Sequence, residues 1–245
     1  TTYDLAGADD RPPQVTVILC SRNHEKYIRC AVESVLAQTF TDWELIIFDN
    51  GSTDRSPAIL REYEGDPRVR LHLFETNEPI TIRLNNAIRE AHGNYSSILC
   101  SDDYYLPNKL AAQMAAFKHA PANVGVVYSP GWRLNTTTGE MWEPKTPAGS
   151  GWILGDLLDA GGDGTTINPI SPLIQKQAFQ WSPFYEDMFM ESELIFFRRE
   201  REHPRVLPTR HEPEHPRGGE VRFTRAGARL NPDVLPFGER VKHGQ

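Results

Sequence analysis

The sequence predicts an α/β fold with a doubly wound, mostly parallel sheet that is flanked by helices. Short apolar runs rich in β-branched residues recur through residues 12–130, as is typical of strands buried on both faces. Amphipathic stretches with apolar residues three and four apart separate most of these runs. Strands that alternate with helices over short links favour a parallel sheet with helical crossovers.

Five strands are expected in this part of the chain. The first two, residues 15–20 and 43–48, are apolar runs without alternation, which indicates burial on both faces. The third, residues 69–74, alternates Val and Leu with Arg and His, so we expect it to be covered on one side only. Residues 96–100 and 124–128 complete the set.

Helices are expected between most of these strands. Apolar spacing predicts them over residues 28–36, through residues 59–63 and over residues 82–91. Gly93 is the expected C-terminal cap of the third of these helices. Pro107 is expected to open a fourth helix, at the first helical position, where proline is tolerated.

The rest of the chain has a weaker pattern. Residues 131–168 are rich in glycine and predict loops, whereas residues 186–200 again have helical spacing. Residues after 200 are charged and rich in proline, which indicates an extended arm. We therefore expect one domain made of residues 12–130 and 131–200, followed by a C-terminal arm over residues 201–245.

Composition narrows the function classes. The chain has 245 residues, with 26 Lys and Arg against 33 Asp and Glu, so its formal net charge is −7. This balance argues against a nucleic-acid-binding protein, which would carry a basic face. No apolar run approaches the ~20 residues of a membrane span, and the polar start has no signal-peptide pattern. We expect a cytoplasmic protein whose three cysteines are buried, reduced thiols.

Adjacent carboxylates follow the fourth expected strand. Asp102 and Asp103 lie in a loop at its carboxyl end, where doubly wound sheets bind their ligands. Two neighbouring carboxylates repel each other, and Mg²⁺ or Mn²⁺ held by one or two carboxylates and ligand phosphates would relieve that repulsion. A simple Asp-Asp turn is the alternative. Asp49 and Asp54 flank a similar loop after the second strand, although turn chemistry also explains that segment.

A third acidic feature lies on the predicted helix over residues 186–200. At 100° per residue, Glu193 falls inside the apolar arc of that helix, whereas Glu191 and Asp187 fall beyond its edge. Burial raises the pKa of a carboxyl toward the range useful for a general base, so Glu193 is the candidate base. The alternative is a residue at the edge of the apolar face that pairs with Arg198 or Arg199.

Five blocks of the sequence together point to a known family: Pro13–Asn23, Ser34–Phe40, Trp43–Asp54, Asn85–Ile88 and Ser101–Asp103. In order and spacing they resemble glycosyltransferase family 2, whose members are inverting enzymes of the GT-A fold that use nucleotide-sugar donors. The resemblance covers roughly residues 12–130, and within the family it is strongest to the enzymes of spore-coat polysaccharide biosynthesis.

The resemblance implies roles for individual residues. Ser21 and Asn23 match the loop that lines the nucleotide, Asp102 matches the aspartate at the ribose, and Asp103 matches the metal ligand. Arg83 lies near the position of a family arginine that approaches the diphosphate. A block around Glu193 matches the one that carries the catalytic base, with Glu in place of Asp.

One departure concerns the nucleobase. The family usually has two aspartates after the second strand, one of which recognises the N3–H of uracil, whereas here the pair is Asp49 and Asn50. An asparagine oxygen can still accept that hydrogen bond, but its amide group can also donate. Uridine diphosphate sugars therefore remain the first choice of donor, followed by those of dTDP and GDP.

The function expected from these observations is a metal-dependent inverting glycosyltransferase that uses Mn²⁺ or Mg²⁺. It would move a sugar from a nucleotide-diphosphate donor to a hydroxyl of a glycan, a peptide or a small molecule. An inactive nucleotide-binding or sugar-binding module is the main alternative. A sugar-phosphate nucleotidyltransferase is a further alternative, although the loop after the first strand lacks the expected glycine-rich, basic pattern.

Overall fold

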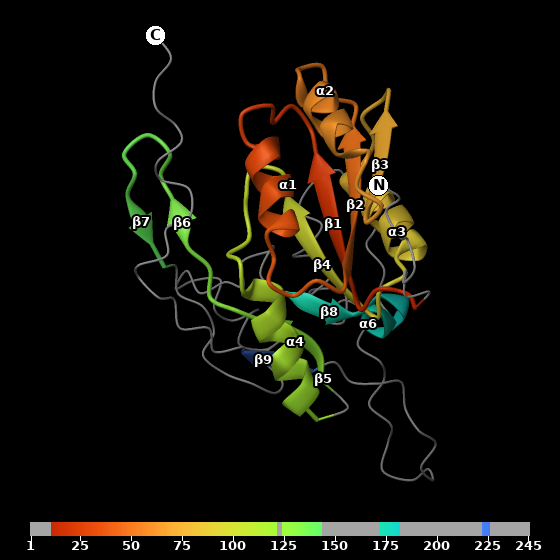
Figure 1. The fold of residues 1–245 in the computed structure, drawn as a ribbon, viewed down its shortest axis with the longest axis vertical. Coiled ribbons are helices and arrows are strands. Elements are labelled where there is room, and N and C mark those ends of the chain that lie inside the picture. The colour runs from red at the N-terminus through yellow and green to blue at the C-terminus, as the bar shows by residue number, and fades with distance from the viewer. Residues whose placement is uncertain (1–10, 122–123, 144–171, 182–221, 226–245) are drawn as a thin grey trace, which may run out of the picture.

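The computed structural model describes residues 11–121, 124–143, 172–181 and 222–225, and these form a helix-flanked sheet of seven strands (Figure 1). The strand order is β3-β2-β1-β4-β8-β5-β9. The strands are β1 (Val15–Ser21), β2 (Trp43–Asn50), β3 (Val69–Phe74), β4 (Tyr95–Cys100), β5 (Val124–Tyr128), β8 (Leu173–Gln175) and β9 (Arg222–Arg225). All neighbouring pairs are parallel except those of β8, which runs antiparallel to both β4 and β5. The predicted α/β fold with a mostly parallel sheet is thus confirmed.

Helices cover both faces of this sheet. They are α1 (Ile28–Leu36), α2 (Ser56–Leu60) with the 3₁₀ turn Arg61–Tyr63, α3 (Ile80–Glu90), α4 (Lys109–His119) and α6 (Lys176–Trp181). A separate two-stranded hairpin pairs β6 (Arg133–Leu134) with β7 (Met141–Trp142). Within the described ranges, no helix is long and apolar enough to cross a membrane.

The core has two layers, one on each side of the sheet. Because successive side chains of a strand point to opposite faces, Val17 and Leu19 of β1 pack with α1, α2 and α4, whereas Ile18 packs with α3 and α6. Every residue of β1 and β2 is buried, as the continuous apolar runs predict. At β3 only Val69 is buried and the other five residues are partly buried. Leu71 and Leu73 pack on one core layer and Phe74 on the other, so β3 is not covered on one side only, and that prediction from the alternating pattern was wrong.

Four of the described strands were not predicted: the hairpin strands β6 and β7, in the region expected to be loops, and two strands of the main sheet. The three residues of β8 are too few to show a period, yet Ile174 pairs with Ser96 of β4 and with Val126 of β5. In the region expected to be an extended arm, β9 pairs in parallel with β5. The sheet therefore contains strands from all three predicted regions, residues 12–130, 131–200 and 201–245.

Two predicted helix ends were wrong. Residue Ala91, with an extended backbone (φ −59°, ψ 129°), caps α3, so Gly93 is not the cap. A Cβ atom at Gly93 would lie 2.6 Å from the backbone nitrogen of Thr16, and this close approach is what requires glycine there. Helix α4 begins at Lys109, two residues after Pro107.

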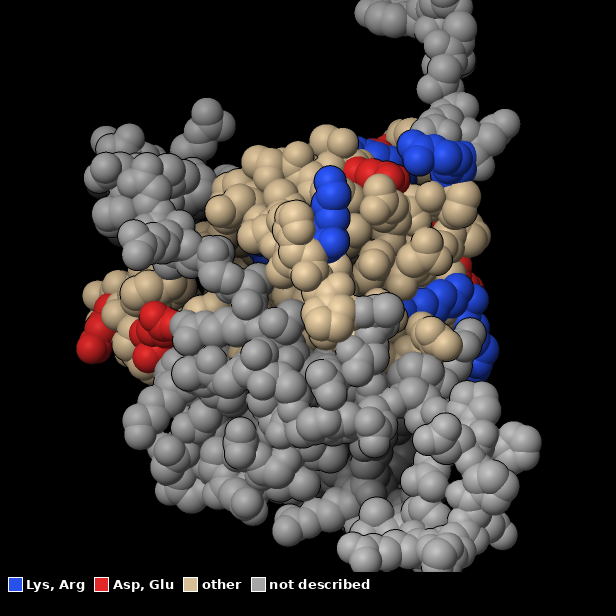
Figure 2. All heavy atoms as spheres, turned by 90° about the horizontal axis from the view of Figure 1, so that it is seen from below, with Lys and Arg blue, Asp and Glu red and all other residues tan. Residues whose placement is uncertain are grey.

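Figure 2 views the molecule from below, onto the side where the central strands begin. Where that view shows the described residues, Lys and Arg lie as separate groups among mostly uncharged side chains. The opposite end, where the central strands finish, gathers the polar residues discussed next.

Candidate active site

The carboxyl ends of β1, β2 and β4 lie side by side and form the rim on which the site is built. Register places Ser21 beside Asp49, while Cys20, the residue before Ser21, pairs with Cys100 on the other side. The loops that leave these strands start at neighbouring points, as expected for parallel strands. The sequence therefore brings three polar loops to one edge.

Asn23 ties the loop after β1 to the loop after β2. Its backbone is left-handed (φ 54°), a conformation that asparagine tolerates better than most residues. Its backbone nitrogen donates to Ser52 Oγ at 2.8 Å, and its side-chain Oδ1 accepts from the backbone nitrogen of Thr53 at 2.8 Å. The two loops are therefore held as one surface.

Asp49 folds back on its own turn. The residue is 1% exposed, and its carboxylate accepts bonds from the Ser52 backbone nitrogen at 2.8 Å and from Ser52 Oγ at 2.5 Å. Gly51 follows with φ 74°, and a Cβ there would lie 2.8 Å from the backbone of Asn77. Asp49 thus shapes the turn, and its carboxylate is buried within that turn.

The Asn50 amide already makes the four hydrogen bonds that such a group can make. Its Nδ2 donates to Asn77 Oδ1 at 3.0 Å and to the carbonyl of Glu78 at 2.8 Å. Its Oδ1 accepts from the Glu78 nitrogen at 3.1 Å and from Arg83 Nε at 3.2 Å. A carboxylate could not donate the first two bonds, so this network accounts for asparagine at the position.

Arg83 belongs to the same network. Its guanidinium stacks on the Phe74 ring at 3.4 Å and pairs with Glu78 at 3.2 Å, and its side chain is only 7% exposed. The sequence predicts that Asn50 and Arg83 belong to one site, and the structure brings them into direct contact.

Ser21 ends β1 with a buried hydroxyl. The residue is 2% exposed, and its Oγ has no hydrogen-bond partner among the described residues. A buried hydroxyl without a partner costs about 1–3 kcal/mol. A ligand at this rim could supply the missing bond.

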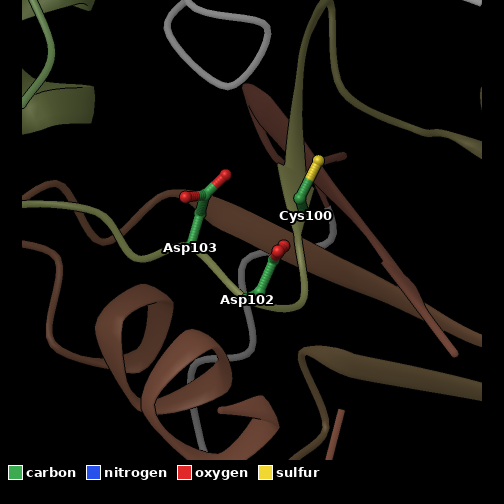
Figure 3. A group of neighbouring side chains, drawn as sticks. All are labelled: Cys100, Asp102 and Asp103. Carbon is green, nitrogen blue, oxygen red and sulfur yellow. The ribbon is translucent and has the colours of Figure 1, made fainter. Parts of the chain in front are cut away.

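The loop after β4 carries the acidic pair. Figure 3 shows Cys100 at the end of the strand and Asp102 and Asp103 on the loop that follows, with the three side chains on the same side of that loop. One ligand atom from each lies within 4.8 Å of the other two. His24 Nδ1 contacts Ser101 Oγ at 2.7 Å, which joins this loop to the one after β1.

Burial and, to a lesser extent, the neighbouring charge of Asp102 raise the pKa of Asp103 to about 6, against a smaller opposite effect of His24. In this environment the charged form of the carboxyl is disfavoured, and a bound cation would offset that cost. Carboxylates are the ligands that suit Mg²⁺ and Mn²⁺ in proteins. The donor set at Asp102 and Asp103 therefore fits the predicted metal.

The structure thus brings Ser21, Asn23, Asp49, Asp102 and Asp103 to one rim. Glu193, with the alternatives Glu191 and Asp187, lies outside the described residues. Two neighbours of the site were not predicted from the sequence. These are His24, which follows Asn23 directly, and Cys100, for which the sequence predicts a buried thiol but which is half-buried at the rim.

Known proteins resemble this chain in sequence and in fold. The family model for glycosyl transferase family 2 matches residues 16–168. The Bacillus subtilis protein TuaG, described as a glycosyltransferase of teichuronic acid biosynthesis, is 40% identical over 103 residues, which are 42% of this chain and 41% of TuaG. The Escherichia coli protein WfgD, described as a UDP-Glc:alpha-D-GlcNAc-diphosphoundecaprenol beta-1,3-glucosyltransferase, is 34% identical over 101 residues, 41% of this chain and 40% of that protein. The matches therefore span about two fifths of these relatives.

Solved structures show the same fold. Residues 1–349 of TarS from S. aureus, in complex with UDP, align with a TM-score of 0.59 at 20% identity, over 75% of this chain and 54% of that one. The mannosyltransferase PcManGT from Pyrobaculum calidifontis, in complex with GDP-Man and Mn²⁺, aligns with a TM-score of 0.52 at 19% identity, over 77% of this chain and 52% of that one. The family model covers well over half of the sequence, and the chain belongs to glycosyl transferase family 2.

Proposed function

We propose that this chain is the donor-binding and catalytic part of a metal-dependent, inverting glycosyltransferase. The observation that carries the proposal is the Asp102–Asp103 pair at the end of β4, beside the loops of β1 and β2, in a chain of this family. This rim is where a sheet of this kind binds its ligand.

The donor is a nucleotide-diphosphate sugar. The nucleotide can contact the Ser21 hydroxyl, which has no partner among the described residues, and the loop around Asn23. Asp102, which is exposed, would face the ribose. TarS was solved with UDP and PcManGT with GDP-Man, so related folds accept both bases. We place uridine first, with dTDP and GDP sugars next.

Asn50 limits how the base is recognised. Both lone pairs of its oxygen are used, by Glu78 and Arg83. To accept a bond from the N3–H of uracil, Asn50 would have to give up one of these bonds. The same observation favours a second candidate function, a module that binds the donor through its phosphates and ribose without transferring the sugar.

The metal, Mn²⁺ or Mg²⁺, would be held by Asp103. The chemistry that a bound ion supplies is stabilisation of the negative charge that develops on the departing diphosphate. Asp102 and the loops of β1 and β2 hold the donor in a fixed orientation, which lowers the entropic part of the barrier.

Glu193 is the proposed base. The acceptor hydroxyl attacks the anomeric carbon from the face opposite the diphosphate, the bond from that carbon to the diphosphate oxygen breaks, and the hydroxyl proton passes to the Glu193 carboxylate. The acceptor is a glycan, a peptide or a small molecule. WfgD, by its name, transfers glucose to alpha-D-GlcNAc-diphosphoundecaprenol.

The experiment that separates an enzyme from a module is donor-sugar hydrolysis without an acceptor, followed as nucleotide release. We expect slow hydrolysis by the wild-type chain, loss of at least about a hundredfold in Glu193→Gln, and near-normal rates in the matched control Glu191→Gln. Equal rates in the wild-type chain and Glu193→Gln would remove Glu193 from the reaction. Nucleotide binding without any hydrolysis would favour the module.

A further inference from the structure

We propose that the Cys100 thiolate is a third protein ligand of the cation site and that it makes the site select thiophilic divalent ions over Mg²⁺. The inference rests on the proposed function, because it assumes that a cation binds beside Asp103. Cys100 belongs neither to the acidic pair nor to the loops that are proposed to bind the nucleotide.

Position is the first observation. Cys100 is the last residue of β4 and precedes the Asp102–Asp103 pair by two positions, so it lies where the buried strand reaches the rim. Its register partner Cys20 packs in the core layer formed with α3, whereas Cys100 is half-buried and is in neither of the two core clusters of the described residues. The thiol of Cys100 is therefore placed at the site rather than in the core.

Distance is the second observation. The Cys100 sulfur and one oxygen each from Asp102 and Asp103 all lie within 4.8 Å of one another. An ion such as Zn²⁺ sits about 2.3 Å from a thiolate sulfur and about 2.0–2.2 Å from a carboxylate oxygen. Two such ligands can thus be at most about 4.5 Å apart on opposite sides of one ion. Small side-chain rotations would bring the three atoms onto a single ion, and Figure 3 shows them facing the same side of the loop.

Donor chemistry gives the consequence. Two carboxylates alone would suit Mg²⁺ and Mn²⁺, whereas a thiolate is a soft ligand that adds affinity for Zn²⁺ and Co²⁺ and little for Mg²⁺. When such an ion binds, the Cys100 thiol gives its proton to solvent and the sulfur bonds to the ion. We therefore expect affinity to rise from Mg²⁺ through Mn²⁺ to Co²⁺ and Zn²⁺, with a wider gap than carboxylates alone would give.

The test uses Co²⁺, because a cobalt–thiolate bond has a charge-transfer absorption that carboxylate ligation lacks. The full chain is titrated with Co²⁺ in the presence of UDP under reducing conditions, and binding is followed by absorption and by calorimetry. Cys100→Ser removes the thiol with little change of volume. Cys30→Ser is the matched control, since Cys30 is also half-buried but lies on α1.

We expect the charge-transfer band in the wild-type chain and in Cys30→Ser, and its loss in Cys100→Ser. Co²⁺ and Zn²⁺ affinity should fall about tenfold or more in Cys100→Ser, since even outer-shell partners of a metal site contribute about 10–100-fold, while Mg²⁺ affinity stays within about twofold. Calorimetric Co²⁺ binding without the band overturns the role of Cys100 and leaves the proposed function standing. If no divalent ion binds with any nucleotide, the inference fails together with the proposed function.

Discussion

Replacing Asp103 by asparagine should stabilise the metal-free chain at neutral pH, although it removes the proposed metal ligand. Burial and the charge of Asp102 raise the pKa of Asp103 from its ordinary 3.8 to about 6. Between these values the unfolded chain has released a proton that the folded chain still holds. The free energy of unfolding therefore falls as pH rises from about 4 to 6, and the loss is complete above 6.

The size of the effect follows from the shift. About two pKa units at about 1.4 kcal/mol each give an upper value near 3 kcal/mol, and solvent screening of a half-buried group reduces this to about 2 kcal/mol. The amide of the variant carries no charge at any of these pH values, so Asp103→Asn should gain about 2 kcal/mol at pH 7 and nothing at pH 4. For a chain of this size, that is a rise of about 4–8 °C in Tm.

The assay is urea unfolding with EDTA at pH 4, 5, 6 and 7, repeated at pH 7 with Mn²⁺ and UDP. Asp66→Asn is the matched control with the opposite sign, because its hydrogen bond with Arg68 lowers the pKa of Asp66 and the variant should lose stability at pH 7. Added Mn²⁺ and UDP should stabilise the wild-type chain but not Asp103→Asn. A variant that is less stable than the wild-type chain at pH 7 without metal would refute the reasoning.

Three further predictions concern residues in or near the sheet. Gly93→Ala should cost about 1–3 kcal/mol in urea unfolding, because the new Cβ would lie 2.6 Å from the Thr16 nitrogen; Gly65→Ala, with nothing within 4 Å, should change little, and equal effects would contradict the packing argument. Ser21→Ala should raise the free energy of unfolding by about 1–3 kcal/mol, because it removes a buried hydroxyl that has no partner in the described part of the chain, while nucleotide affinity falls about two- to tenfold; unchanged affinity by calorimetry would remove Ser21 from the site. Burial lowers the pKa of Lys109 to about 7, so wild-type stability should rise between pH 7 and 10 while the unfolded amine remains charged. Lys109→Met should remove that rise, and an identical pH profile would contradict it.

Much of the fold could be predicted because periodicity in this chain is strong. The continuous apolar runs of β1 and β2 can be satisfied only between two helical layers, and the structure buries every residue of both. The short strand β8 could not be predicted, because its three residues are held by pairing with β4 and β5 rather than by a local pattern. The same limit applies to Gly93, whose role depends on a strand 77 residues away.

Part of the site could likewise be predicted from the sequence and part could not. Adjacent carboxylates after a buried strand indicate a ligand-binding loop, and the structure places Asp102 and Asp103 beside the Ser21 and Asn23 loop. The hydrogen bonds of Asn50 could not be predicted from the sequence, because its partners Asn77, Glu78 and Arg83 lie 27 to 33 residues further along the chain.

Nucleotide binding that depends on a divalent ion tests the central claim most directly. We would measure the thermal stability of the chain with UDP, dTDP, GDP and CDP, each with and without Mn²⁺. A nucleotide at a hundred times its Kd adds about 2.7 kcal/mol, or a rise of about 5–10 °C for a chain of this size. We predict a metal-dependent rise, largest with UDP, that is absent in Asp103→Asn. No rise with any nucleotide in a folded sample would contradict the account of this rim as a donor site.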